Sequence, residues 1–244
     1  MELNREHIDY YSKLLFGKPI TFDGIDVYPL KIREVMEYSL DTYNKFLSLI
    51  SLNRTEIMES LNIVQEVPLY QFIILNIVND TSNEFIDWFL KTLSMILKDD
   101  VLFTTDGYFL IGESNKKIDE NNFEQIVQII KDQNFMKEKK ETITTKKERD
   151  YKEMVKKARE RHKGYLKALG KLSDTDLLDL MSSLSAKHPS INLLQIQDLT
   201  IYQLIDQYKR LNMIDDYFIA IDSLFAGADK KSVDLIHWSK KFQD

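Results

Sequence analysis

The chain has 244 residues, of which 43% are hydrophobic and 30% are charged, and its formal net charge is −6. The length is typical of one or two globular domains, and the hydrophobic content is too high for a disordered chain. Because the chain contains no cysteine, disulfides, thiol catalysis and cysteine-ligated metals are excluded as well.

The distribution of apolar residues gives no sign of a membrane protein. No apolar run approaches the roughly 18 residues of a membrane-spanning helix. The polar, acidic start at residues 1–6 does not resemble a signal peptide. We therefore expect an intracellular protein. The low numbers of glycine and proline, seven and four, favour long helices with few tight turns.

The first 136 residues are predicted to form a helical domain that also carries two β-hairpins. Apolar residues recur in this part at spacings of three and four, as they do on one face of a helix. The helices are expected at 3–16, 31–51, 53–61, in the densely apolar segment that begins at Pro68, at 81–97, and from Asp119 to Phe135.

Two turn signals predict the hairpins. Asp23-Gly24 supplies two residues that tolerate positive φ between β-prone arms at 20–22 and 25–28. A second turn at 105–107 separates arms rich in β-branched and aromatic residues, within 101–111. Because an isolated two-stranded hairpin is barely stable in water, both hairpins must pack on the helices or on another protein.

Residues 137–163 differ from the rest of the chain in charge. They hold twelve Lys or Arg and six Asp or Glu, a local net charge of +6, which leaves −12 for the remainder. We place a charged linker at 137–149 and an exposed helix at 147–167. Residues 150–244 are then a small all-α domain, so the fold class is mainly α, with a helical N-terminal unit, two small hairpins and a charged connector.

The longest predicted helix begins after Thr200. The Thr200 hydroxyl can accept from the backbone amide of Gln203, and the Gln203 side chain can reach back to the amide of Thr200. Apolar residues continue at helical spacing from Ile201 through Phe218 to Phe225, where Gly227 can end the helix. We expect this whole stripe to face a core, with a break near Asn212 or Asp215-Asp216 as an alternative.

No constellation in the sequence indicates catalysis, a cofactor or a metal. The four histidines, at 7, 162, 188 and 237, lie in separate segments without metal-ligand spacing. Glycine-rich phosphate loops and serine nucleophile motifs are absent. We expect a protein that is not an enzyme. An enzyme of unrecognised type remains an alternative, which a deep polar pocket with perturbed acids would support.

Binding is the remaining class of function, and two kinds of surface are candidates. Trp238 and Phe242 lie near the end of the chain beside Lys240 and Lys241, and could anchor a protein partner. The edges of the two hairpins could accept a strand from another chain. Folding of the aromatic pair into the core is the competing interpretation.

The basic segment 137–163 supports an alternative function, nucleic-acid binding. However, it carries one acid for every two basic residues and only Tyr151 as an aromatic, so no stacking platform is evident. The helices predicted at 173–185 and 201–211 are about fifteen residues apart, whereas a helix-turn-helix needs three or four.

The C-terminal part resembles a known group of proteins in its motifs. They are Ser190-x-Asn192, Leu199-Thr200-x-x-Gln203-x-x-Asp206, Arg210-Leu211-Asn212, Ala226-Gly227-Ala228-Asp229 and Ile236-x-Trp238, with Tyr28-Pro29-Leu30-Lys31-Ile32 and Asp119-x-x-Asn122-Phe123 earlier in the chain. These features are similar to small helical proteins of the tail-morphogenesis module in tailed phages that infect Gram-positive bacteria.

The resemblance implies a tail assembly chaperone or a related component. Its expected partners are phage structural proteins, such as a tail tube or tape-measure subunit, and its expected location is the cytoplasm of the bacterial host, with retention in the virion as an alternative. The chain departs from the shortest such chaperones in its greater length and its charged connector.

Overall fold

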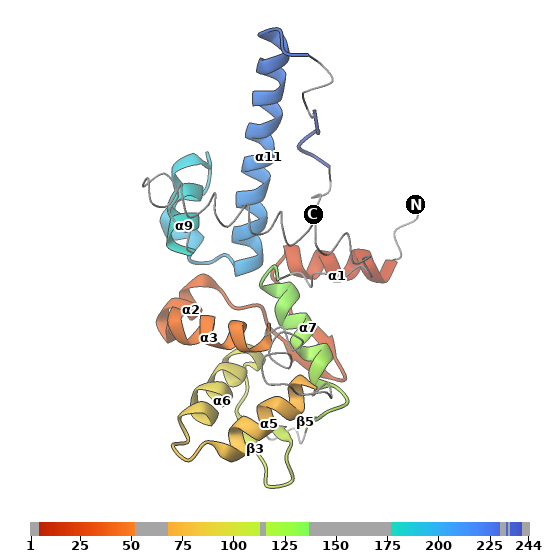
Figure 1. The fold of residues 1–244 in the computed structure, drawn as a ribbon, viewed down its shortest axis with the longest axis vertical. Coiled ribbons are helices and arrows are strands. Elements are labelled where there is room, and N and C mark those ends of the chain that lie inside the picture. Colours follow the sequence, from red (N-terminus) through yellow and green to blue (C-terminus); the bar gives the residue numbers. More distant parts are fainter. Residues whose placement is uncertain are drawn as a thin grey trace, which may run out of the picture.

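The computed structural model describes residues 5–51, 68–112, 116–136, 177–229, 233 and 235–240. Figure 1 shows a mainly helical molecule with two small antiparallel sheets, which confirms the predicted fold class. The helix predicted at 53–61, the linker at 137–149 and the helix at 147–167 lie outside the described residues. The boundaries of the two domains remain predictions.

The elements of the N-terminal part alternate helices with short strands. In chain order they are α1 (Arg5–Leu15), β1 (Ile20–Phe22), β2 (Ile25–Val27), α2 (Ile32–Tyr38), α3 (Leu40–Ile50), α5 (Leu69–Asn79), α6 (Glu84–Leu97), β3 (Val101–Phe103), β4 (Phe109–Ile111), β5 (Lys116–Ile118) and α7 (Phe123–Gln133). The described C-terminal part is helical: α9 (Leu177–Lys187), α10 (Leu193–Ile196) and α11 (Ile201–Phe225).

The helix predicted over 31–51 is two helices. The chain leaves the helical conformation at Ser39, where φ is 154° and ψ is 115°. The Ser39 hydroxyl then accepts from the backbone amide of Thr42 at 3.3 Å and so caps α3. Apolar spacing continues across the break, which explains why periodicity alone predicted one helix.

The first hairpin forms as predicted, and the second is larger than predicted. Asp23 and Gly24 both have positive φ, 50° and 71°, and join β1 to β2. In the second sheet, β4 lies between β3 and an additional strand, β5. Two lysines begin β5 and only Ile118 is buried, so this three-residue strand lacks the alternation of apolar and polar residues that would have predicted it from the sequence. The following helix consequently begins at Phe123 rather than at Asp119.

Aromatic rings from several elements form the centre of the main core. Phe89 of α6 is fully buried, with its ring centroid 5.6 Å from that of Phe46 and 5.7 Å from that of Phe109. Phe109 also lies near Phe123, so α3, α6, β4 and α7 meet at these four rings. The core thus explains how two short sheets are stabilised: they pack on the helices.

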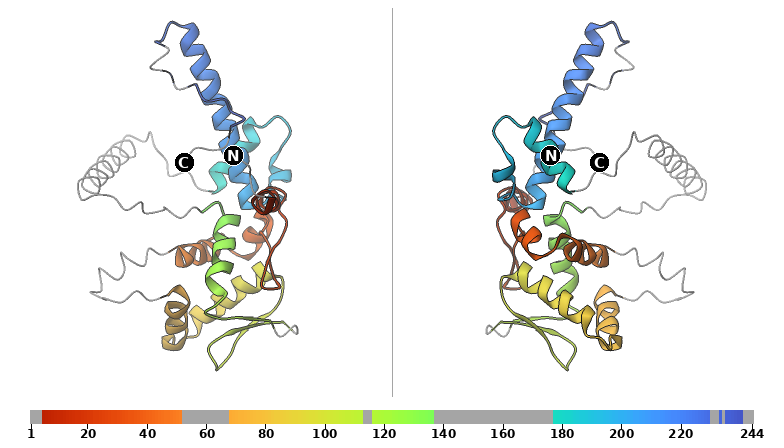
Figure 2. Two further views of the ribbon diagram at one scale, coloured as in Figure 1. Left: turned by 90° about the vertical axis from the view of Figure 1, so that its right-hand side faces the viewer. Right: turned by 90° about the vertical axis from the view of Figure 1, so that its left-hand side faces the viewer.

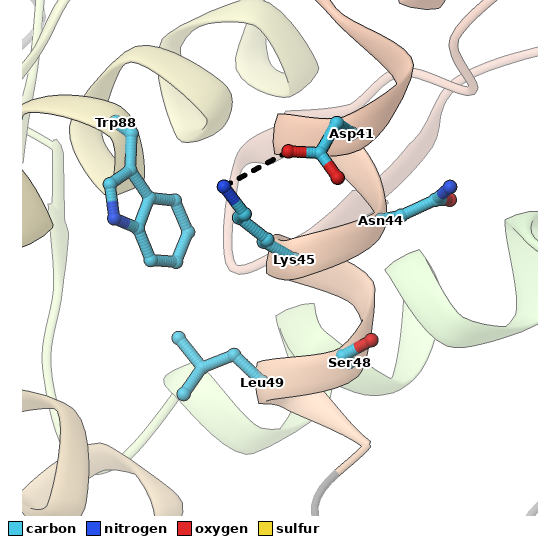
Figure 3. Close-up of a pocket in the computed structure, with 6 residues that line it drawn as sticks. All are labelled: Asp41, Asn44, Lys45, Ser48, Leu49 and Trp88. Carbon is cyan, nitrogen blue, oxygen red and sulfur yellow. Dashed lines mark ion pairs between the residues drawn. The ribbon is translucent and has the colours of Figure 1, made fainter.

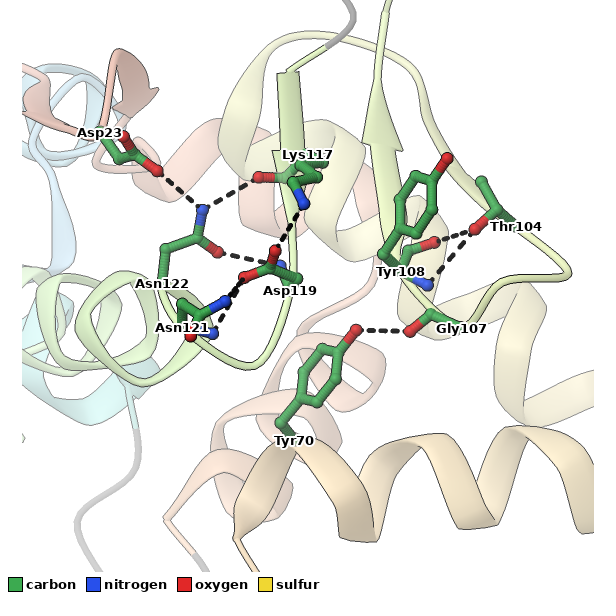
Figure 4. Close-up of polar contacts among 9 residues, drawn as sticks. All are labelled: Asp23, Tyr70, Thr104, Gly107, Tyr108, Lys117, Asp119, Asn121 and Asn122. Atoms are coloured by element: carbon green, nitrogen blue, oxygen red, sulfur yellow. Dashed lines mark hydrogen bonds and ion pairs between the residues drawn. The ribbon is translucent and has the colours of Figure 1, made fainter.

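Asn122 connects the two sheets through a buried amide. Its Nδ2 atom donates to the Asp23 carboxylate at 3.1 Å and to the Lys117 carbonyl at 3.0 Å, while its Oδ1 accepts from the backbone amide of Asp119 at 3.0 Å (Figure 4). Asp119 in turn forms an ion pair with Lys117 at 2.9 Å. This network fixes the hairpin turn at Asp23 against the start of α7.

The C-terminal helices pack against the start of α2. Ile32 is fully buried in a second cluster with Leu184, Ile196, Ile201 and Leu204. The backbone amide of Ile32 donates to the Leu199 carbonyl at 2.9 Å, and Arg33 forms an ion pair with Asp198. The second cluster is therefore built from both ends of the described chain.

Helix α11 begins as the sequence predicted. The Thr200 hydroxyl accepts from the Gln203 amide at 3.2 Å, and the Gln203 side chain accepts from the Thr200 amide at 2.9 Å. The helix then continues without a break to Phe225. The alternative of an interruption near Asn212 or Asp215-Asp216 is therefore wrong.

The expected burial of the whole apolar stripe of α11 is also wrong. Leu204 is fully buried, but Phe218 and Phe225 are exposed. With about 1.5 Å of rise per residue, the 25-residue helix is roughly 37 Å long. Its C-terminal half extends past the other labelled helices in Figure 1, and the turned views of Figure 2 show the same extension. The apolar stripe is therefore longer than the elements that pack against it.

Candidate interaction surfaces

The segment 235–240, which we call the tail, runs back along α11. The Arg210 guanidinium of α11 donates from Nη1 to the carbonyl oxygens of Trp238 and Lys240, at 3.1 and 2.6 Å. The His237 ring lies between Tyr217 and Trp238, with centroid distances of 5.2 Å to each. These contacts hold the described part of the tail to the middle of the helix.

Trp238, the central residue of the predicted anchor, lies at the surface. Its side chain is 39% exposed and belongs to neither buried cluster, and Lys240 is exposed beside it. Phe242 and Lys241 lie outside the described residues. Use of this pair to bind a partner remains a prediction, but Trp238 is accessible to one.

The distal part of α11 presents a second apolar surface, which the sequence analysis missed. Phe218, Ile219 and Phe225 are 56, 63 and 87% exposed. Phe218 and Phe225 continue the apolar stripe that includes the buried residues Ile201 and Leu204, so the pattern could not distinguish a face toward the core from a face toward solvent. The C-terminal half of α11 is thus a candidate surface for binding another protein.

This distal part is also acidic. Residues 211–229 contain four aspartates, at 215, 216, 222 and 229, and no lysine or arginine. Asp215 forms an ion pair with Lys187 at the end of α9. Asp216 and Asp222 are exposed. Exposed apolar side chains and the exposed acids Asp216 and Asp222 therefore share one end of the helix.

The hairpin edges are held more firmly than the sequence implied. The Gln133 side chain of α7 donates to the Val27 carbonyl at 2.9 Å, and the Tyr28 amide donates to the Ile96 carbonyl at 3.0 Å. In the larger sheet, β3 and β5 are edge strands of three residues each. Such short edges offer few backbone groups to an added strand.

A shallow pocket of about 450 Å³ lies between α3 and α6 (Figure 3). Leu49 and Trp88 supply apolar lining, and Asn44 and Ser48 add polar groups. Its ionisable side chains, Asp41 and Lys45, form an ion pair with each other at 2.9 Å. The pocket offers no arrangement of nucleophile and base.

A polar junction joins α1, α7 and α11. The Tyr10 hydroxyl donates to the Asp132 carboxylate at 2.6 Å, and Gln128 donates to the same carboxylate at 3.0 Å. Burial raises the pKa of Tyr202 to about 12, and the nearby Asp206 carboxylate adds to that effect. Asp206 itself is only 7% exposed, and burial raises its pKa despite the opposing charges of Arg210 and Lys209.

We expect Asp206→Asn to gain stability relative to the parent as the pH rises from about 4 to about 7. A raised pKa means that the folded state holds the proton more tightly than the unfolded chain does. Ionisation of Asp206 therefore costs stability above the ordinary aspartate pKa, and asparagine avoids this cost. Urea unfolding at both pH values measures the effect, with Asp222→Asn as a control for charge removal on α11. A difference that stays flat or falls with pH would contradict it.

His188 and His237 each contact the serine two residues further along the chain. His188 accepts from the backbone amide of Ser190 at 3.1 Å, and His237 lies 2.7 Å from the Ser239 hydroxyl. Within the described ranges, no cluster of three or more His, Asp or Glu side chains could hold a metal ion. In the same part of the chain, no helix is both long and apolar enough to span a membrane.

Comparison with known proteins shows a similarity at the C-terminal end. A family model of the YomV second domain matches residues 170–243, and YomV is a protein of a Bacillus phage region. The match covers less than a third of the chain and includes α9, α10, α11 and the tail. It indicates a phage-derived protein. No curated protein and no solved structure matches the chain.

Proposed function

We propose that this protein is a non-enzymatic phage tail assembly protein, similar to a tail assembly chaperone, that binds tail structural proteins in the cytoplasm of the bacterial host. The similarity to the YomV second domain supports the phage origin. The motifs at Leu199–Asp206 and Ala226–Asp229, which resemble those of tail-morphogenesis proteins, support the assignment to tail assembly.

The exposed apolar end of the molecule is the observation that carries a binding function. Phe218, Phe225 and Trp238 are all accessible, on α11 and on the tail that runs beside it. Apolar side chains gathered in one exposed region mark interaction sites on soluble proteins more often than catalytic ones. The expected partner is a tail tube or tape-measure subunit.

We expect Trp238→Ala combined with Phe242→Ala to weaken capture of the tail partner while leaving the thermal midpoint nearly unchanged. Trp238 lies outside both buried clusters, so its truncation removes contact area without opening a cavity in a core. Co-expression with the tube or tape-measure subunit of the same phage, followed by affinity capture, measures the effect. Phe242 is included because of its place in the sequence.

Leu178→Ala serves as the matched control, since it removes an exposed apolar side chain from α9. Unchanged capture by the double variant would refute the terminal anchor. Unfolding of the double variant would place the pair in the core. If purified chain instead binds nucleic acid, with an affinity that falls steeply with salt, the alternative function of the basic segment 137–163 is favoured.

A further inference from the structure

One side of distal α11 carries three large apolar residues and one acid. Phe218, Ile219, Asp222 and Phe225 are spaced by one, three and three positions, so they share one side of the helix, which we call the distal face. All four are exposed. A solvent-facing helix side normally carries polar residues, whereas three of these four are large and apolar.

The tail does not cover the distal face. The tail contacts α11 through Tyr217, whose ring meets His237, and through Arg210. Tyr217, Ile221 and Leu224 are half-buried, and Ala220 is buried, on the other side of the helix. Among the described residues, one side of the helix is therefore occupied by contacts within the chain, while the distal face is exposed.

The charge of this end of the helix indicates what kind of partner fits. Residues 211–229 hold four aspartates and no lysine or arginine, so a second copy packed along the same face would bring Asp222 against an equally acidic helix end. Like charges brought together at an interface repel each other and disfavour that pairing. Basic side chains beside an apolar surface would instead complement Asp216 and Asp222.

We propose that the distal face of α11 docks, as a helix, into an apolar groove of a partner protein whose rim carries lysine or arginine. Phe218 and Phe225 are seven residues apart, the spacing of two anchors in the helix-in-groove mode of recognition. Ile219 fills the groove between them, and Asp222 meets the basic rim. The proposal rests on the proposed function, since it takes the chain to be a binding protein, and it adds the surface and the chemistry of the partner.

Two synthetic amphipathic helical peptides with the same leucine stripe, one flanked by lysine and one by glutamate, are suitable probes. Their affinity for the full chain can be measured by fluorescence anisotropy. We expect the lysine peptide to bind at least about tenfold more tightly than the glutamate peptide, because the acids of α11 select the basic flank. Asp216→Asn combined with Asp222→Asn should reduce the ratio of the two affinities.

Phe218→Ser combined with Phe225→Ser should weaken binding of the lysine peptide at least about tenfold, although every acid of the chain is retained. Both side chains are exposed, so the thermal midpoint should not change, which separates loss of binding from loss of folding. Leu75→Ser combined with Val78→Ser, two exposed apolar residues of α5, is the matched control and should bind as the parent does.

Equal binding of both peptides would overturn the proposal, because the acids of α11 would then not select a basic partner. Undiminished binding of the lysine peptide by the double serine variant would also overturn it, because the distal face would then not be the binding surface. Light scattering that shows a dimer of the parent, abolished in the same variant, would make a second copy the occupant and overturn it too. If the lysine peptide binds as expected but no tail subunit is captured, the proposed function fails and the docking surface stands. If a tail subunit is captured through Trp238 while the peptides ignore α11, only the docking surface fails.

Discussion

Phe89→Ala should lower the free energy of unfolding by about 3–5 kcal/mol, the largest effect that we expect of a single substitution in this protein. The Phe89 side chain is fully buried, and its ring contacts those of Phe46, Phe85 and Phe109. Truncation would leave a cavity that rings from three different elements cannot easily fill, because each is held by its own backbone. Urea denaturation followed by circular dichroism measures the change.

Leu102→Ala is the control for this prediction, because Leu102 projects into solvent from β3 near the same core. Its effect should stay within about 0.5 kcal/mol, as for most surface substitutions. A loss below about 1 kcal/mol for Phe89→Ala would mean that the four-ring centre does not hold α6 against the larger sheet.

Leu204→Ala should destabilise the protein by about 2–5 kcal/mol. Leu204 is fully buried in the second cluster, where it packs with Ile32 of α2 and with Leu184 of α9. The same cluster attaches the C-terminal helices to the N-terminal part, so the substitution should also loosen that attachment. Thermal unfolding measures the first effect. The rate of proteolysis after Lys187, at the end of α9, measures the second.

Phe218→Ala, on the same helix, is the matched control. The apolar stripe alone would predict the same loss of stability as for Leu204→Ala. Because the structure exposes Phe218 to solvent, we expect the free energy of unfolding to change by no more than about 0.5 kcal/mol. A large loss for Phe218→Ala would show that the distal half of α11 is packed in the folded protein, and would also remove the basis for docking there.

Both surfaces that we connect with binding lie at one end of the molecule. Arg210 and Tyr217 of α11 hold the tail, and the distal face lies a few residues further along the same helix. The match to the YomV second domain spans this same region.

The sequence by itself determined the features that depend on neighbouring residues. The turn at Asp23-Gly24 forms because both residues adopt positive φ at little cost. Helix α11 begins after Thr200 because the partner of its hydroxyl, the Gln203 amide, is only three residues away. The mainly helical class follows from repeated apolar spacing in the same way, and Trp238 could be recognised as a candidate contact from its type and position.

Tertiary structure alone decided which apolar residues are covered. Leu204 and Phe218 belong to one helix and one periodic pattern. Leu204 nevertheless packs with Ile32 of α2, 172 residues earlier in the chain, whereas Phe218 is exposed to solvent. Likewise, β5 exists because β4 offers it a pairing edge, not because Lys116 and Lys117 favour a strand. Periodicity shows which side of a helix is apolar, whereas burial depends on where distant elements end. The distal face is exposed because the elements that cover the first half of α11 do not reach it.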